Sequence, residues 1–196
     1  IGHELELLER IDGTTQPSDR VVADFFRQRK YLGSHDRRHI SESVFGLVRH
    51  RRYVEALLEE FVAEHPEYVD LDRPHVRYLP LSLAYSATRT HRADAPRESE
   101  TDFPESLWKT YFPNHNSAPF RHWVAEHADL DFLPEDEMLE WGVRYSFQDW
   151  MVGRWREHVG ADVEQLLQSL NDPASTCLRV NLLKATREEC QERLHS

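Results

Sequence analysis

Residues 34–62 read SHDRRHISESVFGLVRHRRYVEALLEEFV, and this stretch decides the fold class. Its apolar residues recur every three or four positions, at Ile40, Val44, Leu47 and Val48 and again at Val54, Leu57, Leu58, Phe61 and Val62. That spacing places them on one side of a helix, so it predicts amphipathic helices that face a core. His65 and Pro66 end the pattern, because the residue before a proline is driven out of the helical region.

Helical patterns continue on both sides of this stretch. Helices are predicted at about 4–11, 18–31, 74–89, 147–160 and 163–171, with short helices and irregular joints between 103 and 141. Gly13 is expected to end the first helix in a left-handed conformation, and Pro80 to kink or divide the helix that contains it. Residues 90–102 are polar and lack periodicity, which indicates an exposed loop.

The apolar period changes to two after Thr176. Leu178, Val180 and Leu182 alternate with Arg179, Asn181 and Leu183, which predicts a strand. Thr186 and Glu189 form a capping box that predicts a following helix. The expected fold is therefore mainly α, a helical bundle followed by a linker and the first strand and helix of a small α+β subdomain. Since a lone strand cannot satisfy its hydrogen bonds, we expect the chain to end inside a domain. No methionine begins the sequence, so we expect that the N-terminus is also trimmed and that the chain is a fragment.

Charge is unevenly distributed along the 196 residues. The net charge is −11, yet residues 19–52 contain nine basic and four acidic residues, which gives this segment +5 and leaves −16 for the rest. Clustered Arg and Lys bind phosphate oxygens, so the segment is a candidate nucleic-acid surface, to which Tyr31, His39 and Tyr53 add rings that stack on bases. A solvated charged helix face is the alternative interpretation.

The remaining sequence features indicate no catalytic, metal or cofactor site. The twelve histidines show no metal-ligand spacing, and the seven glycines form no dinucleotide or methyl-donor cradle. Cys177 and Cys190 are interpreted as incidental thiols in a reducing, cytoplasmic compartment. Trp150 and Trp155, beside Phe147 and Met151, are expected to pack in a core. No apolar run approaches the roughly 18 residues of a membrane span.

Two stretches resemble the Sun/Fmu (RsmB-like) family of RNA 5-cytosine methyltransferases, which methylate ribosomal RNA. The first is LGSHDRRHI at 32–40 with VFGLVRHRR at 44–52, and it is similar to the family's NusB-like helical domain. The second lies within 145–194, with LNDP at 170–173, LRVNLLK at 178–184 and TREE at 186–189. It resembles the linker and the opening strand and helix that precede the methyl-donor domain.

The resemblance implies a division of the chain. Residues 1–142 would form a helical NusB-like RNA-binding domain, 143–174 a helical linker, and 175–196 the start of a truncated α+β subdomain before a missing methyltransferase domain. The middle, 54–142, matches the family poorly, so a reduced or divergent bundle is expected there.

The resemblance also implies the activity of the parent protein, an S-adenosylmethionine-dependent RNA (cytosine-5-)-methyltransferase. Its two catalytic cysteines and its methyl-donor site lie in the downstream domain, so the fragment is predicted to be inactive, to bind no cofactor and to position ribosomal RNA for its own downstream domain. The RNA-binding residues expected are Arg27, Arg29, Lys30, Arg37, Arg38, Arg49, Arg51, Arg52, Arg179, Asn181 and Lys184. Arg179 and Asn181 would alternatively brace the subdomain against the catalytic domain.

Two other functions remain open at this point. One is a stand-alone NusB-like factor that binds RNA or a ribosomal protein without enzymatic activity. The other is a structural helical scaffold that contacts proteins through the acidic remainder of its surface.

Overall fold

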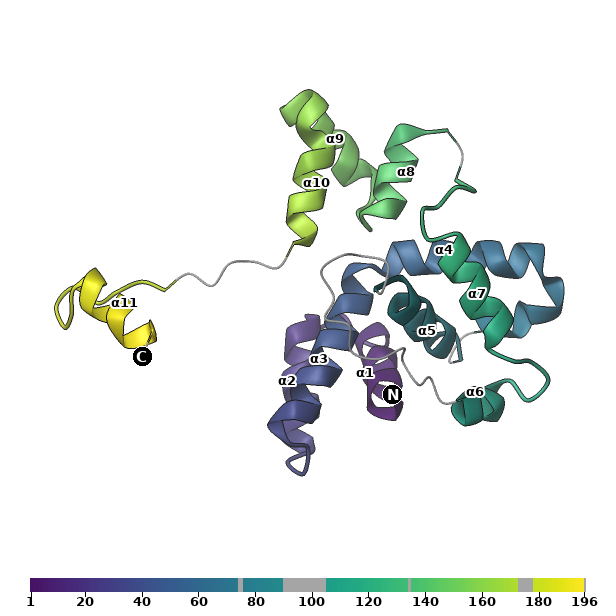
Figure 1. Ribbon diagram of the computed structural model, residues 1–196, viewed down its shortest axis with the longest axis horizontal. Helices are drawn as coiled ribbons and strands as arrows, with labels where there is room; N and C mark the ends of the chain where they lie inside the picture. Colours follow the sequence, from purple (N-terminus) through teal and green to yellow (C-terminus); the bar gives the residue numbers. More distant parts are fainter. Residues whose placement is uncertain (74–75, 90–104, 134, 173–177, 196) are drawn as a thin grey trace.

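The computed structural model describes residues 1–73, 76–89, 105–133, 135–172 and 178–195. Within these ranges the chain forms α-helices and two short 3-10 helices (η), and no strand (Figure 1). The elements are α1 (Gly2–Asp12), α2 (Ser18–Gln28), α3 (Ser34–Arg49), α4 (Arg51–Glu64), η1 (Pro66–Asp72), α5 (Tyr78–Arg89), α6 (Glu105–Tyr111), α7 (Ala118–Glu126), α8 (Glu137–Arg144), α9 (Asp149–Val159), η2 (Gly160–Asp162), α10 (Val163–Asn171) and α11 (Arg187–His195).

Helix α4 lies at the centre of the larger group of helices, α1 to α7. It contacts α3, η1, α5 and α7, and also α8 from the smaller group. Val54, Leu57, Leu58 and Phe61 are fully buried, as their helical spacing predicts. The Phe61 ring packs against a group of aromatic rings from neighbouring elements, namely His65, Tyr68, Phe120 and Trp123. The predicted core face is therefore confirmed.

The first three helices lie together beside this centre (Figure 1). Helix α1 contacts α2, α3 and α5, and it buries Leu7 and Leu8 among them. Helices α3 and α5 approach closely at Gly46, where a Cβ atom would lie 1.9 Å from the Tyr85 hydroxyl oxygen. A side chain at position 46 would therefore force the Tyr85 ring to move.

The smaller group consists of α8, α9, η2 and α10, with its own core of Trp141, Val152, Val163 and Leu167. It is attached to the first turn of α4 through the loop between α8 and α9. The Ser146 hydroxyl oxygen accepts a hydrogen bond from the Tyr53 backbone N–H (3.1 Å), so a residue from another part of the chain caps α4. Arg52 binds the Phe147 carbonyl and the Asp149 carboxylate, both at 2.6 Å.

Most predicted helices are confirmed, and the differences have local causes. The predicted helical run from residue 34 is divided at His50, where α3 ends and α4 begins in a new direction. Pro80 lies in the first turn of α5, where its missing N–H removes no helical hydrogen bond, so it neither kinks nor divides the helix. Gly13 follows α1 with a φ of −76°, so the expected left-handed cap is wrong. The predicted loop at 90–102 lies outside the described residues.

The predicted strand is wrong for the residues that the structure describes. Residues 178–181 have no regular secondary structure and 182–184 form a turn, while Thr176 and Cys177 lie outside the described residues. The physical reason is that a strand needs a ladder partner, and the described part of the chain supplies none. The capping box is confirmed, since Thr186 and Glu189 exchange hydrogen bonds at the start of α11. Helix α11 lies apart from the other helices (Figure 1).

Candidate RNA interface

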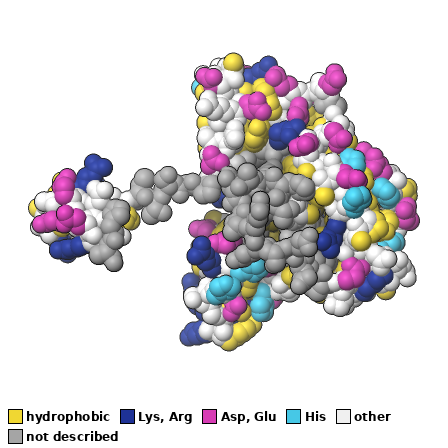
Figure 2. Space-filling view, in the orientation of Figure 1, with side chains coloured by type: hydrophobic (Ala, Val, Ile, Leu, Met, Phe, Trp, Pro, Cys, Tyr) yellow, Lys and Arg dark blue, Asp and Glu magenta, His cyan; other side chains and the backbone are white. Residues whose placement is uncertain are grey.

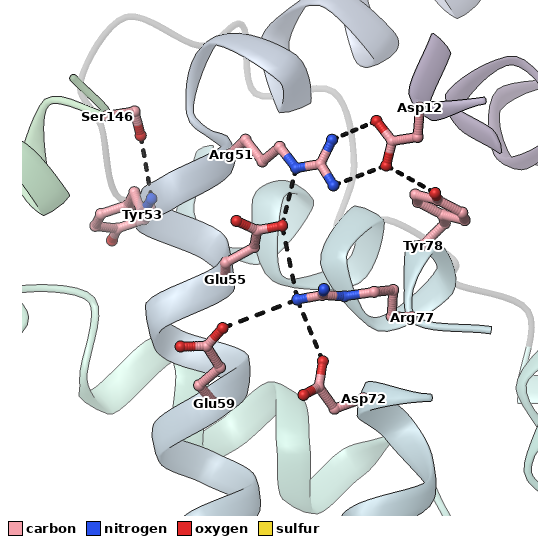
Figure 3. A network of polar contacts seen from close by, with 9 residues as sticks. All are labelled: Asp12, Arg51, Tyr53, Glu55, Glu59, Asp72, Arg77, Tyr78 and Ser146. Atoms are coloured by element: carbon pink, nitrogen blue, oxygen red, sulfur yellow. Dashed lines mark hydrogen bonds and ion pairs between the residues drawn. The ribbon is translucent and has the colours of Figure 1, made fainter. Parts of the chain in front are cut away.

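Arg51 holds the centre of the polar network in Figure 3. Its guanidinium forms a two-point contact with the Asp12 carboxylate, one of whose bonds measures 2.7 Å, and its Nε donates to Glu55 at 2.8 Å. Tyr78 donates to Asp12 Oδ2 at 2.7 Å, the same oxygen that accepts from Arg51 Nη2. Since Asp12 ends α1, Arg51 begins α4 and Tyr78 begins α5, the Asp12 carboxylate joins three helices. The Arg51 guanidinium is therefore bound by carboxylates within the protein.

The same network continues to Arg77, which lies before α5 (Figure 3). The Arg77 Nη2 atom lies 3.2 Å from Asp72, 3.6 Å from Glu55 and 4.0 Å from Glu59. Burial and the neighbouring charges of Asp72 and Glu55 raise the pKa of Glu59. The network thus holds more carboxylates than guanidinium groups, so it presents no positive charge to a nucleic acid.

The network also shifts the pKa values of Asp12 and Tyr78. Burial alone would raise the pKa of Asp12, but hydrogen bonds from Arg51 and Tyr78 outweigh it and lower the pKa below 3.8. Burial, together with the hydrogen bond to Asp12, raises the pKa of Tyr78 to about 12. The shifts widen the pH range over which Asp12 is charged and Tyr78 is neutral, which is the combination that the three-helix contact needs.

Other predicted RNA-binding cations also have partners inside the protein. Arg27 pairs with Asp24, Arg29 with Glu6, Arg38 with Glu42 and Arg52 with Asp149. Arg37 donates to the backbone carbonyls of Leu32 (2.9 Å) and Arg29 (3.5 Å) and keeps its charge uncompensated. The Arg27 and Arg38 pairs lie within one helix and are exposed, so they stabilise little and can open.

Three cations of the segment 19–52 are exposed and have no side-chain partner among the described residues: Arg20 on α2, Lys30 in the α2–α3 turn and Arg49 at the end of α3. Blue side chains in Figure 2 are accordingly scattered among magenta ones and form no continuous positive surface on that face. The excess of +5 read from the sequence is reduced by acidic partners that lie elsewhere in the chain.

The aromatic residues predicted for base stacking separate into two kinds. Tyr53 is 3% exposed and its hydroxyl donates to the Ala128 carbonyl at 2.5 Å, so its ring belongs to the core. Tyr31 is 72% exposed, and its hydroxyl lies 3.3 Å from His3 Nε2. His39 is also exposed. The ring surfaces of Tyr31 and His39 are therefore accessible to solvent.

The C-terminal candidates lie in the segment before α11. Arg179, Asn181 and Lys184 are exposed, and the Asn181 side chain accepts a hydrogen bond from the Leu183 N–H at 3.0 Å, which stabilises the turn. This segment lies apart from α2 and α3 in Figure 1, so the structure does not bring the two predicted groups together.

Trp150 corrects the expectation that both tryptophans pack in a core. Trp155 is partly buried and its ring meets Phe147 edge-on, but Trp150 is 62% exposed. The Trp150 indole N–H donates to the Gln148 side chain, which orients the ring, and Arg154 lies one turn further along α9 with no side-chain partner among the described residues. Helical spacing did not reveal this, because residues 147, 150, 151 and 155 share one face only approximately.

Neither of two closely packed glycines leaves open space for a ligand, and no metal cluster is found among the described residues. Gly46 and Gly142 are filled by neighbouring side chains, since a Cβ at position 142 would lie 2.7 Å from the Arg52 guanidinium, and neither opens a cradle for a cofactor. No group of three His, Cys, Asp or Glu side chains among the described residues is arranged to hold a metal. None of the described helices is long and apolar enough to cross a membrane.

Comparisons with known proteins point to one family. Residues 147–196 match the family described as the ferredoxin-like domain of RsmF/B-like methyltransferases. A protein of Synechocystis sp. named probable ribosomal RNA small subunit methyltransferase B is 29% identical over 183 residues, which cover 89% of this chain and 39% of that protein. The chain thus shows distant similarity to the N-terminal region of RsmB (Sun) rRNA methyltransferases. No solved structure matches.

This similarity extends further than the two motifs that suggested it. Because it covers 89% of the chain, it includes most of the middle, 54–142, which the motifs alone matched poorly. The chain spans about two fifths of the length of the relative.

Substitution of paired and unpaired arginines should separate structural from binding roles. Arg51→Ala leaves Asp12 without its forked partner, so we expect the free energy of unfolding to fall by about 2 kcal/mol. Arg49→Ala, two residues away, should change it by less than about 0.5 kcal/mol. Urea denaturation followed by circular dichroism measures both, and equal effects would contradict the assignment.

Acid should remove the contribution of Asp12. Because its pKa is lowered on folding, its stabilising effect is present above its unfolded value and is lost as the pH falls through the lower folded value. The stability difference between the wild type and Asp12→Asn should therefore be largest near about pH 7 and shrink below about pH 3.8. Urea denaturation across that range tests this, with Asp131→Asn, an exposed aspartate, as the control.

Proposed function

We propose that this chain is the RNA-recognition part of an S-adenosylmethionine-dependent ribosomal RNA cytosine-C5 methyltransferase. Its helices α1 to α7 act as a NusB-like domain that positions RNA, and the segment after α10 begins the subdomain that adjoins the chain's own methyltransferase domain. In this proposal, methyl transfer takes place in that further domain, which supplies the catalytic cysteines and the donor site.

The observation that carries this proposal is the combined similarity to rRNA methyltransferase proteins, in the chain as a whole and in the ferredoxin-like domain. The attachment of α8 and α9 to the first turn of α4 supports a positioning role. Hydrogen bonds from Arg52 and Tyr53 to residues 146–149 hold the second group of helices on the first. RNA bound to the helical domain would thus be held in a defined place relative to the segment that follows.

We further propose which residues contact the RNA. Lys30 and Arg49 bind phosphate oxygens, because they are exposed and no carboxylate in the described chain competes for them. Trp150 stacks on a base, because an exposed indole with a fixed orientation offers a flat apolar surface, and Arg154 lies one turn away to hold a phosphate. Arg179 and Lys184 extend the contact toward the catalytic domain.

A stand-alone NusB-like RNA-binding factor is the second candidate function. The match of residues 147–196 to a methyltransferase-associated domain favours the enzyme subunit over that factor. Both candidates require RNA binding, whereas a protein-binding scaffold does not.

Phosphate contacts are tested by salt dependence. The double variant Lys30→Ala/Arg49→Ala should bind a ribosomal RNA fragment more weakly and reduce the slope of log affinity against log salt by roughly 1.4 to 1.8, for two lost contacts. Fluorescence anisotropy across a salt series measures the slope. Arg121→Ala, an exposed arginine on α7 without a side-chain partner in the described chain, is the control and should change it little. An unchanged slope in the double variant would overturn these contacts.

Base stacking is tested at Trp150. Trp150→Ala should lower RNA affinity by about 1–3 kcal/mol while the salt slope and the unfolding free energy stay the same, because the lost surface is apolar and exposed. Tyr111→Ala, which removes an exposed aromatic ring from α6, is the matched control. Equal losses in the two variants would assign the effect to general surface changes, and no loss at Trp150 would exclude the stacking contact.

A further inference from the structure

A pocket of about 430 Å³ lies between α1 and the start of α3. Leu32 and Ile40 form apolar parts of its wall, the rings of His3 and His39 lie at its side, and the carboxylates of Glu4 and Asp36 supply its acidic part. Its size is in the range of small-ligand sites, and its lining combines apolar side chains with two histidines and two carboxylates. Histidine side chains gather on this part of the surface (Figure 2).

Glu4 is the unusual member of this pocket. Its side chain is 8% exposed, and its Oε1 atom is buried without a hydrogen-bond donor among the described residues. The nearest side-chain positive group is His39 Nε2 at 3.5 Å, which is an ion-pair distance only. A buried carboxylate oxygen without a donor is costly, so a donor from a ligand would remove that cost.

The α2–α3 turn, which precedes the lining residue Leu32, carries groups suited to RNA. Tyr31 lies beside His3, with ring centroids 6.1 Å apart, and most of its surface is open to solvent. Lys30 precedes Tyr31 and has no side-chain partner in the described chain, while Arg37 donates to the Leu32 carbonyl and keeps its charge. His39 is 65% exposed, so its ring is able to turn away from Glu4 on a fast timescale.

We infer that this pocket binds one unpaired RNA base that carries an exocyclic amino group, which donates a hydrogen bond to the Glu4 carboxylate. Cytosine, adenine and guanine carry such a group. Uracil carries carbonyl oxygens on either side of its one ring N–H, and a carboxylate repels them. The base lies between Leu32 and Ile40 on one side and the His3, Tyr31 and His39 rings on the other, and Lys30 holds its phosphate. The inference rests on the proposed function, since it requires RNA.

The acidic pocket does not contradict RNA binding. Unneutralised carboxylates repel phosphate, yet they accept hydrogen bonds from base amino groups, and sequence is read in single strands by such contacts together with stacking. The cations in and after the α2–α3 turn and the carboxylate inside the pocket therefore act on different parts of one nucleotide. This arrangement gives the domain a preference among bases, which phosphate contacts alone do not supply.

The test compares two oligonucleotides of about 12 residues, oligocytidylate and oligouridylate, by fluorescence anisotropy at low salt. The wild type should bind oligocytidylate about tenfold more tightly. Glu4→Gln keeps the shape of the side chain but offers both a donor and an acceptor, so the preference should fall to about twofold or less. Glu9→Gln, an exposed carboxylate on the same helix, is the control and should keep the preference.

A second variant guards against loss of folding in Glu4→Gln. Tyr31→Ala alters only an exposed ring, and it should weaken binding of both oligonucleotides by a similar factor. Equal binding of the two oligonucleotides by the wild type, or an unchanged preference in a folded Glu4→Gln variant, would overturn the base pocket and leave the proposed function intact. Binding of neither oligonucleotide, nor of the ribosomal RNA fragment, would overturn both.

Discussion

Two features of α4 constrain the rest of this structure: one of its sides is buried, and its first turn is bound by residues from other parts of the chain. One side of the helix is fully buried between α3, α5, α7 and η1, so its N-terminal end is fixed in place. The side chains of Arg51 and Arg52 extend from that end toward different helices. Arg51 reaches Asp12 at the end of α1, and Arg52 reaches Asp149 at the start of α9. Neighbouring residues thus tie together the helices that precede and follow α4.

These contacts explain why the loop between α8 and α9 has its particular composition. Ser146 adopts a φ of 58°, which is uncommon for a residue with a side chain, and its hydroxyl accepts the Tyr53 N–H that α4 would otherwise leave unpaired. A Cβ at position 142 would lie 2.7 Å from the Arg52 guanidinium and 2.6 Å from the Asp149 carboxylate, so a side chain there would disturb the Arg52–Asp149 pair. The joint between the two groups of helices therefore depends on a few single residues.

Much of the fold was predictable because helical periodicity is a local signal. The apolar positions from Ile40 to Val62 are mostly buried or partly buried, and the capping box at Thr186 forms as expected. The strand at Leu178 was not predictable in the same way, because a strand depends on a partner that local sequence does not supply. The break at His50 also escaped prediction, since the apolar pattern runs through it while the helix axis changes direction.

The sequence predicted which cations belong to the candidate site, but not the net charge that the folded site presents. Residues 19–52 hold an excess of cations, yet Asp12, Glu55 and Asp149 come from parts of the chain up to about a hundred residues away and neutralise Arg51 and Arg52. Counting charges within a segment cannot detect such partners. With few free cations on an acidic chain, little counterion release is available, so stacking and base contacts must supply much of any affinity for RNA. The proposed RNA-recognition role therefore depends on contacts with unpaired bases more than on phosphate charge.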